Sequence, residues 1–406
     1  MKNIFFTFVA FFFYPAMSVA ADIEEAPASK RGVQLTIDDL RTFTDVFNQI
    51  RSNFVEEKDD HSLLVAAIEG MLSKLDPWSV FLDSEESQEL ANSSMGRYGG
   101  IGVSLDLRDW RIIVDSVTPG GPAETAGVLP GDLVTSVEGK PVRGRKVFES
   151  VDALMGEPGT EVSVRFKTGS KRSRELRLTR EFIPVTSVIS ELLPGNIAYF
   201  EITHFHRNTH LELESSIKTE QANSDNPLAG IILDLRGNPG GVILPAVEIA
   251  DGFLDQGMIV FTKGRYQASL LEFRAHQGQW ASGIPLVILT DGKTASASEV
   301  LTGALQDHGR AVIIGEKTFG KGSIQSVFTL RNGSTLKLTT AHYFTPSGKT
   351  IHELGIEPDI AKKTTSEMLA FVTGHENDGL IHAARRYFES LSSGLEQNSA
   401  IKETIK

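Results

Sequence analysis

The chain has 406 residues, of which 40% are hydrophobic and 23% charged, a balance that excludes disordered, collagenous and multispanning membrane proteins. Aspartate and glutamate outnumber lysine and arginine by 52 to 40, so the net charge of −12 argues against nucleic acid as the main partner. Cysteine is absent, which excludes disulfides, iron–sulfur clusters, cysteine zinc sites and a cysteine nucleophile.

The first segment has the features of a targeting signal. Lys2 precedes a phenylalanine-rich apolar run, Ile4 to Met17, which is shorter than the roughly 20 residues of a membrane-spanning helix. The small residues of Ser18-Val19-Ala20 then suit a cleavage point after residue 20. We predict a secretory signal peptide over residues 1–20 and a periplasmic protein, with an uncleaved anchor as the alternative.

An N-terminal helical segment is predicted within residues 21–96. Apolar residues recur at three- and four-residue steps over 37–54, and Thr36 precedes them as an N-cap. A second apolar stripe covers 64–75 and is stopped by Pro77. Stripes of this kind are more typical of packing faces than of binding sites.

Residues 97–182 are predicted to form a small β-rich domain, because short alternating runs are separated by glycine and proline clusters. The predicted strands are 102–107, 111–117, 133–137, 161–166 and 173–179. The last hairpin, 165–180, carries seven basic residues and one acidic residue. For this hairpin we favour a solvated strand face over an anion-binding patch.

Residues 183–362 alternate between strand and helix patterns, which predicts an α/β core with βαβ units. The predicted strands are 197–202, 230–235, 285–289 and 311–314, the predicted helices 211–221, 242–254 and 297–308. A hairpin, 326–330 with 335–344, follows them. The tail, 363–406, contains one predicted helix over 380–391.

Two sequence motifs suggest ligands but lack the features that those ligands need. The stretch 315–321 resembles a phosphate-binding loop, yet Gly322 stands where Ser or Thr is required and an extended segment follows. His204, His206 and His210 form a cluster without a carboxylate at fixed spacing, so a histidine-rich loop is favoured over a metal site. We therefore predict no cofactor and no metal.

Two strand-to-helix junctions are candidates for catalysis. Thr294-Ala295-Ser296-Ala297-Ser298-Glu299 contains an S-x-x-E capping box, yet its small residues leave the Ser296 hydroxyl uncrowded at a helix N-terminus. The glycines of Asp234-Leu235-Arg236-Gly237-Asn238-Pro239-Gly240-Gly241 permit close approach of the backbone to a ligand, or form a plain turn. The G-x-S-x-G elbow is absent, and a Ser-His-Asp site using Asp234 with His308 or His342 stays open.

From about residue 35 to 362 the chain resembles the C-terminal processing peptidases, or tail-specific proteases. The motifs are GMLSKLDPWS at 70–79, GGIGV at 99–103, GGPAETAGVLPGDLV at 120–134, ILDLRGNPGG at 232–241, TASASEVLTGALQD at 294–307 and IGEKTFGKGSIQ at 314–325. The resemblance implies a crotonase- or ClpP-like α/β protease core with an inserted PDZ domain and an N-terminal helical segment. It also implies a serine protease with a Ser–Lys catalytic pair.

The resemblance assigns roles to particular residues. It implies Ser296 as nucleophile, Lys321 as general base and Gln325 as the residue assisting the lysine. It implies the backbone N–H groups of Gly241 and Ala297 as the oxyanion hole. It also implies that Gly100, Ile101, Gly102 and Val103 bind the C-terminal carboxylate of a substrate.

The implied chemistry is coherent, because a serine hydroxyl needs a general base to become a nucleophile. A lysine can be that base only if desolvation lowers its pKa from the usual value near 10.4. Gln325 is harder to justify, since four residues of regular strand span about 13 Å, and Gly320 and Gly322 would have to bend the chain.

We therefore expect an exported serine endopeptidase that binds protein or peptide substrates through their free C-termini. The resemblance implies that the variable tail governs homo-oligomer formation or contact with an adaptor protein. A catalytically silent PDZ peptide-binding protein on the same scaffold is the alternative, and the presence of Ser296, Lys321 and Gln325 argues against it.

Overall fold

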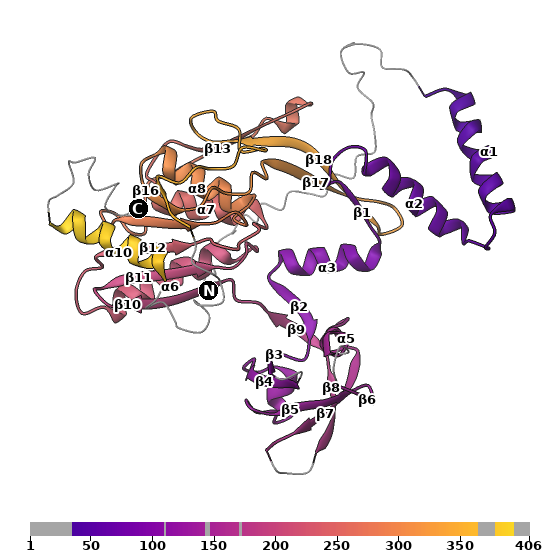
Figure 1. The fold of residues 1–406 in the computed structure, drawn as a ribbon, viewed down its shortest axis with the longest axis horizontal. Helices are drawn as coiled ribbons and strands as arrows, with labels where there is room; N and C mark the ends of the chain where they lie inside the picture. Colours follow the sequence, from indigo (N-terminus) through magenta and orange to yellow (C-terminus); the bar gives the residue numbers. More distant parts are fainter. Residues whose placement is uncertain (1–34, 109–110, 143–146, 170–172, 364–377, 394–406) are drawn as a thin grey trace, which may run out of the picture. The chain divides into compact units, whose positions relative to one another are not determined.

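The computed structural model describes residues 35–108, 111–142, 147–169, 173–363 and 378–393, so the predicted signal peptide lies outside the described part (Figure 1). The chain divides into two compact units, Met1–Ala67 and Ile68–Lys406. Within the described residues, no helix has the length and apolar character needed to cross a membrane.

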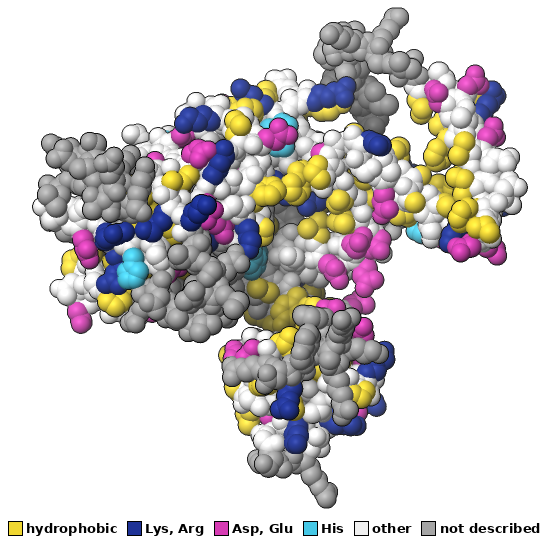
Figure 2. All heavy atoms as spheres, viewed as in Figure 1, with side chains coloured by type: hydrophobic (Ala, Val, Ile, Leu, Met, Phe, Trp, Pro, Cys, Tyr) yellow, Lys and Arg dark blue, Asp and Glu magenta, His cyan; other side chains and the backbone are white. Residues whose placement is uncertain are grey.

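The first unit contains helix α1, Ile37–Asn53, and the beginning of α2, Asp60–Leu72. Thr36 caps α1 as predicted: its side chain accepts from the Asp39 N–H at 3.1 Å, and the Asp39 carboxylate accepts from the Thr36 N–H at 2.8 Å. However, α1 has no buried residue, and Figure 2 shows hydrophobic side chains exposed along it. The helix is confirmed, whereas the expected packing face is not buried.

Strand β1, Val80–Leu82, and helix α3, Ser84–Ser94, follow in the second unit. The Asp83 carboxylate caps α3 by accepting from the N–H groups of Glu85 and Glu86, each at 2.9 Å. Helix α3 was not predicted, because its polar sequence has no apolar stripe. Its D-x-x-E capping box was the signal that could have found it.

The β-rich region folds into a six-stranded antiparallel sheet in the order β3-β4-β5-β7-β8, with β6 paired to β5. All of the strands predicted here are present. The elements are β3 Val103–Arg108, β4 Arg111–Val117, α4 Pro122–Thr125, β5 Leu133–Val137, β6 Lys140–Pro141, α5 Val147–Asp152, β7 Glu161–Lys167 and β8 Arg174–Thr179. A separate pair, β2 Arg97–Gly100 and β9 Glu181–Pro184, flanks the sheet in the sequence.

The α/β core is built on a second six-stranded sheet, in the order β10-β11-β12-β15-β16-β19. All its neighbouring pairs are parallel except β10 with β11. The elements are β10 Val188–Leu193, β11 Ile197–Ile202, α6 Thr209–Asn223, β12 Gly230–Asp234, α7 Ile243–Phe253, β15 Leu286–Thr290, α8 Ala297–Asp307, β16 Ala311–Gly315, β19 Ile360–Ala361 and α10 Gly379–Ser392. The predicted βαβ pattern is therefore confirmed.

Both faces of this sheet are buried, which explains its continuous apolar strands. In β12, Ile231 and Leu233 pack into one hydrophobic cluster with residues of α6, α7 and α8. Ile232, between them, packs into a different cluster with residues of α10. The core therefore has three layers, and the tail helix α10 is one of them.

A five-stranded antiparallel sheet lies beside this core, in the order β1-β18-β13-β14, with β17 paired to β18. Its elements are β13 Met258–Gly264, β14 Glu272–Arg274, β17 Ser323–Thr329 and β18 Thr335–Phe344, with a short 3-10 turn η2 at Gln267–Ser269. The predicted hairpin is confirmed as β17 and β18. Strand β17 also excludes the phosphate-binding loop, which requires a helix at this point.

Candidate active site

Three loops leave the carboxyl ends of neighbouring parallel strands. We name each loop by the role that the sequence predicts for it: the oxyanion turn, 235–242, follows β12, the nucleophile loop, 291–296, follows β15, and the base loop, 316–322, follows β16. The register places Asp234 beside Leu289 and pairs Thr290 with Gly315, so the three loops begin side by side. Open α/β sheets bind ligands at this edge.

Ser296 lies at the N-cap of α8 in a strained conformation. Its φ of 58° and ψ of −115° fall in a region that residues with side chains rarely adopt. Such strain, about 1–3 kcal/mol, persists where the surrounding structure imposes it, often at active sites. Ser296 is half-buried, and it is the last residue of the nucleophile loop.

A buried carboxylate, Glu299, joins the nucleophile loop to the base loop. It accepts from the Ser296 N–H at 2.8 Å and from the Lys321 N–H at 2.8 Å. The Gly320 N–H, at 2.7 Å, and the Thr318 hydroxyl, at 2.6 Å, complete its partners. Burial raises the pKa of Glu299, although these four hydrogen bonds favour the charged form. The sequence predicted only the capping box with Ser296.

Two backbone N–H groups beside Ser296 have no acceptor among the described residues: those of Gly241 and Ala297. A Cβ built on Gly240 would lie 3.0 Å from the Ala297 nitrogen and 2.8 Å from Ser296 Cβ, so the oxyanion turn packs directly on the nucleophile loop. Gly241 itself has φ of 140°, and a Cβ there would lie 2.1 Å from the Phe205 carbonyl oxygen. Only glycine fits this position.

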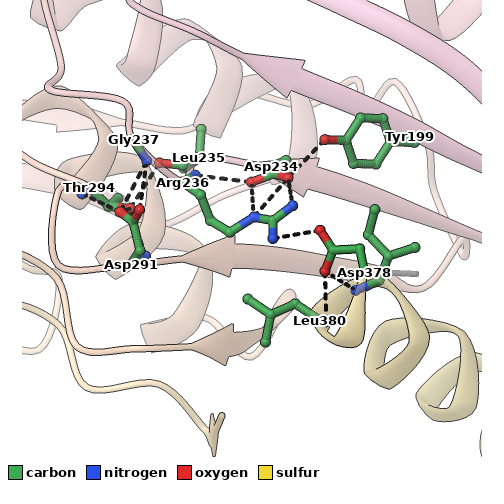
Figure 3. A network of polar contacts seen from close by, with 10 residues as sticks. Tyr199, Asp234, Leu235, Arg236, Gly237, Asp291, Thr294, Asp378 and Leu380 are labelled. Carbon is green, nitrogen blue, oxygen red and sulfur yellow. Dashed lines mark hydrogen bonds and ion pairs between the residues drawn. The ribbon is translucent and has the colours of Figure 1, made fainter. Parts of the chain in front are cut away.

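Further hydrogen bonds fix these two loops to each other. The Asp291 carboxylate accepts from the Gly237 N–H at 3.0 Å and from the Thr294 N–H at 2.9 Å (Figure 3). The Ala295 N–H donates to the Asn238 carbonyl at 3.0 Å. These hydrogen bonds hold the loops that carry the N–H groups of Gly241 and Ala297 in fixed positions.

Lys321 is half-buried, and its ammonium lies 4.3 Å from the centre of the Trp78 ring. Burial lowers the pKa of Lys321, the nearby charge of Lys337 lowers it further, and Glu299 opposes both. Within the described residues, no hydrogen bond joins the Lys321 ammonium to the Ser296 hydroxyl. The base loop is therefore next to the nucleophile loop, while the lysine side chain rests on Trp78.

Gln325 lies on β17 and does not contact the lysine through a hydrogen bond in the described structure. Its amide donates to the hydroxyls of Ser323, at 2.9 Å, and Thr339, at 3.1 Å. A β-bulge between Ile324 and Gln325 shifts the register of the strand, which is the irregularity that the glycines were expected to supply. The assisting role of Gln325 stays a prediction.

The structure does not assemble the Ser-His-Asp alternative. His308 caps the far end of α8, an 11-residue helix about 16 Å long, and its ring bonds the Met258 carbonyl at 2.6 Å. His342 is opposite Ser323 on β18 and contacts the ring of His352. Asp234 instead forms an ion pair with Arg236, whose Nε donates to the Asp234 carboxylate at 2.9 Å.

Two members of the histidine cluster stay together, with the ring centres of His204 and His206 5.3 Å apart, whereas His206 and His210 contact different carboxylates. His206 is buried, with Nε2 at 3.2 Å from Glu212, and His210 Nδ1 lies 2.9 Å from Glu248. In the described part of the chain, no group of three or more His, Asp or Glu side chains is arranged to hold a metal ion.

The predicted carboxylate loop, 100–103, connects β2 to β3. The carbonyls of Ile101 and Gly102 accept from Ala123 and Thr118, each at 2.9 Å, whereas their N–H groups have no acceptor among the described residues. Gly102 has φ of 74°. Among the strands that the structure describes, β3 pairs only with β4, so no described strand covers its other edge. A sheet edge of this kind is where an extended peptide can add as a further strand.

Comparison with known proteins gives three domain matches. Residues 196–362 match the model of peptidase family S41, residues 113–168 a PDZ domain, and residues 6–86 the N-terminal domain of the activating protease CtpB. A putative S41 protease from Bacteroides fragilis has the same fold, with a TM-score of 0.52 at 16% identity over 87% of this chain and 97% of the other. The fold is therefore an S41 peptidase core with an inserted PDZ domain.

Two curated relatives identify the family. The carboxy-terminal-processing protease of Bartonella bacilliformis is 39% identical over 329 residues, covering 80% of this chain and 76% of the relative. The carboxy-terminal processing protease CtpA of Bacillus subtilis is 35% identical over 315 residues, covering 77% and 67%. Fold and family define a serine protease. The chain belongs to the carboxy-terminal processing protease family.

Proposed function

We propose that the protein is an exported endopeptidase that captures the C-terminal tails of protein substrates with its PDZ domain and cleaves them with Ser296 and Lys321. The observation that carries the proposal is the buried Glu299 carboxylate, which binds the backbone of both residues. A shared carboxylate keeps the nucleophile loop and the base loop in register.

Acylation begins when the neutral Lys321 amine takes the Ser296 proton as the hydroxyl oxygen attacks the scissile carbonyl carbon. In the described structure the Lys321 ammonium lies 4.3 Å from the centre of the Trp78 ring, so the proposal requires the lysine to move to within hydrogen-bond distance of the hydroxyl. The N–H groups of Gly241 and Ala297 then donate to the oxyanion. Collapse breaks the C–N bond, and the lysine ammonium returns its proton to the leaving amine. In deacylation the same lysine takes a proton from water as its oxygen attacks the acyl carbon. The bond between that carbon and the Ser296 oxygen then breaks, and the lysine returns the proton to Ser296.

Substrate capture uses backbone chemistry as well. An extended tail adds to the open edge of β3, and its terminal carboxylate accepts from the N–H groups of Ile101 and Gly102. Hydrogen bonds to a charged group are each worth about 1.5–3 kcal/mol. The free carboxylate therefore distinguishes a C-terminus from an internal segment.

Export follows from residues 1–20, whose charged start, apolar run and small-residue site suit a signal peptide. N-terminal sequencing of protein from the periplasmic fraction is expected to begin near residue 21. Mature periplasmic protein that retains Met1 would exclude cleavage.

Cleavage by Ser296 is tested with a fluorogenic peptide that ends in a free carboxylate. We expect Ser296→Ala to lose cleavage by a factor of about 10⁴ or more and to lose labelling by a fluorophosphonate. The control is Ser326→Ala, which makes the same chemical change at a serine whose hydroxyl bonds the Thr340 hydroxyl on the neighbouring strand. This variant should retain both cleavage and labelling. Cleavage by folded Ser296→Ala at the wild-type rate would refute the assignment.

A further inference from the structure

The C-terminal helix α10 is part of the protease core. One of its faces packs Leu380, Ile381, Ala384 and Phe388 into the cluster on the second face of the parallel sheet. The outer face carries exposed His382 and Arg386, and Figure 2 shows basic and histidine side chains gathered over this helix. An amphipathic helix placed in this way completes the third layer rather than extending away from the domain.

Asp378 begins this helix and uses its two carboxylate oxygens for different partners. Oδ1 accepts from the Leu380 N–H at 2.8 Å and from the Ile381 N–H at 3.3 Å, which caps α10. Oδ2 lies 2.7 Å from Nη1 of Arg236 (Figure 3). The residue is 7% exposed, so this ion pair is largely removed from water.

Arg236 is at the start of the oxyanion turn, and it is held from two sides. Its Nε donates to both oxygens of Asp234, at 2.9 and 3.0 Å, and Asp234 also accepts from the Tyr199 hydroxyl at 2.8 Å. Burial opposes the charge of the guanidinium, but the carboxylates of Asp234 and Asp378 outweigh it and raise the pKa of Arg236. Removing either carboxylate leaves a buried cation with incomplete pairing.

The other end of the turn is fixed by Asn238 and Phe205. The Asn238 side chain donates to the Ile202 carbonyl at 2.7 Å and accepts from the Gly240 N–H at 2.8 Å. The Phe205 N–H donates to the Gly240 carbonyl at 2.9 Å, and its carbonyl accepts from the Val242 N–H at 2.8 Å. The first end of the turn is held by the Asp291 carboxylate, which accepts from the Gly237 N–H at 3.0 Å, and by the ion pairs of Arg236 with Asp234 and Asp378. Of these contacts, the pair with Asp378 is the one that comes from the tail helix.

We infer that Asp378 is a positioning residue for the oxyanion hole: the tail helix α10 reaches the catalytic edge of the sheet and aligns the Gly241 N–H through Arg236. This inference rests on the proposed function, because it takes Gly241 as an oxyanion donor. It gives the C-terminal tail a part in the chemistry of cleavage.

The test measures kcat and KM of full-length Asp378→Asn on the free-carboxylate peptide, well below its melting temperature. The neutral amide keeps the size of the side chain but loses the charge facing Arg236. We expect kcat to fall about 10- to 100-fold, since misplacement of a reacting group by 1 Å can cost 10²-fold, with KM unchanged. Asp378→Glu keeps the carboxylate and should recover most of this loss.

Two further variants separate positioning from stability. Asp83→Asn makes the same change at the N-cap of α3 and should leave kcat unchanged. Ala384→Gly weakens α10 from within and should lower the melting temperature without lowering kcat of the folded enzyme. If Asp378→Asn lowers the melting temperature alone, or lowers kcat no more than Ala384→Gly does, the inference is wrong.

A readout independent of cleavage distinguishes this inference from the proposed function. Hydrogen exchange of the amides of Gly237, Asn238, Gly240 and Gly241 should become faster in Asp378→Asn than in wild type, whichever residue is the nucleophile. Unchanged exchange there overturns the positioning role. Activity of Ser296→Ala would overturn the proposed function while leaving the exchange result intact.

Discussion

The proposed catalytic edge, formed by the loops 235–242 and 291–296, and the loop 100–103 of the PDZ domain, here called the PDZ loop, present the same backbone arrangement in different surroundings. Each presents two neighbouring N–H groups that have no acceptor among the described residues, Gly241 with Ala297 and Ile101 with Gly102. At the catalytic edge, a strained serine and a half-buried lysine lie beside the pair. At the PDZ loop, the surroundings are apolar, with Ile101 buried in the hydrophobic core of the domain.

Under the proposed function, this difference predicts that the two sites serve different steps. A pair of donors beside a nucleophile stabilises charge that develops only in the transition state, whereas a pair without one binds a charge already present in the substrate. Changes at the catalytic edge are therefore expected in kcat, and changes at the PDZ loop in KM.

Among the substitutions that test this comparison, Gly241→Ala is expected to have the largest effect on kcat. The new Cβ would lie 2.1 Å from the Phe205 carbonyl oxygen, so the turn must move and its N–H is displaced. We expect kcat to fall by about 10²–10³-fold, the cost of one oxyanion donor, with KM little changed. Steady-state kinetics on the free-carboxylate peptide measures both constants.

Gly237→Ala is the matched control for this substitution. Gly237 also has a positive φ, 70°, but a Cβ there meets nothing within 4 Å. An alanine at 237 should therefore introduce the strain of a positive φ without displacing the N–H of Gly241. Equal losses of kcat in the two variants would show that strain alone is responsible.

A smaller effect is expected when the substrate's C-terminal carboxylate is replaced by an amide. Loss of one charge-assisted contact, about 1.5–3 kcal/mol, should raise KM roughly tenfold or more and leave kcat unchanged. Gly102→Ala should reduce this discrimination, because its Cβ would lie 3.2 Å from Ile183 and Thr118, whereas Gly120→Ala has the same φ and open space. Equal kinetics for acid and amide peptides would contradict a carboxylate-binding loop.

The smallest effect concerns the pH dependence of the base. The positive charge of Lys337 lowers the pKa of Lys321, so Lys337→Gln should raise it. Only neutral lysine accepts the serine proton, and the acid limb of kcat/KM should therefore move to higher pH. Lys218 has an exposed side chain on α6, and Lys218→Gln should leave the limb in place. A limb that moves to lower pH would contradict the assignment of Lys321.

Sequence alone could predict the core because its parallel strands are continuous apolar runs and its helices have recognisable ends. The predicted range 230–235 is the observed β12 to within one residue, and 297–308 is α8 to the same precision. Strands β13 and β14 could not be predicted, because β13 pairs with β18 far along the chain and β14 pairs with β13.

The site was partly predictable for the same reason. Glu299 was identifiable as a capping residue from its spacing to Ser296, which is a local signal. Its bonds to the base loop, and the ion pair of Asp378 with Arg236, join distant segments and leave no local signal. The placement of Lys321 on Trp78 is likewise a long-range contact. The homo-oligomer and the adaptor stay predictions of the family resemblance.

The most direct test of the account is Lys321→Arg. Arginine keeps the positive charge and similar length, but its pKa above about 12 prevents it from acting as a base. We predict a folded protein, checked by circular dichroism, that still binds free-carboxylate peptides and whose cleavage falls by about 10³-fold or more. His308→Ala and His342→Ala should remain active. A folded Lys321→Arg enzyme that cleaves within a few-fold of wild type would contradict the Ser–Lys assignment.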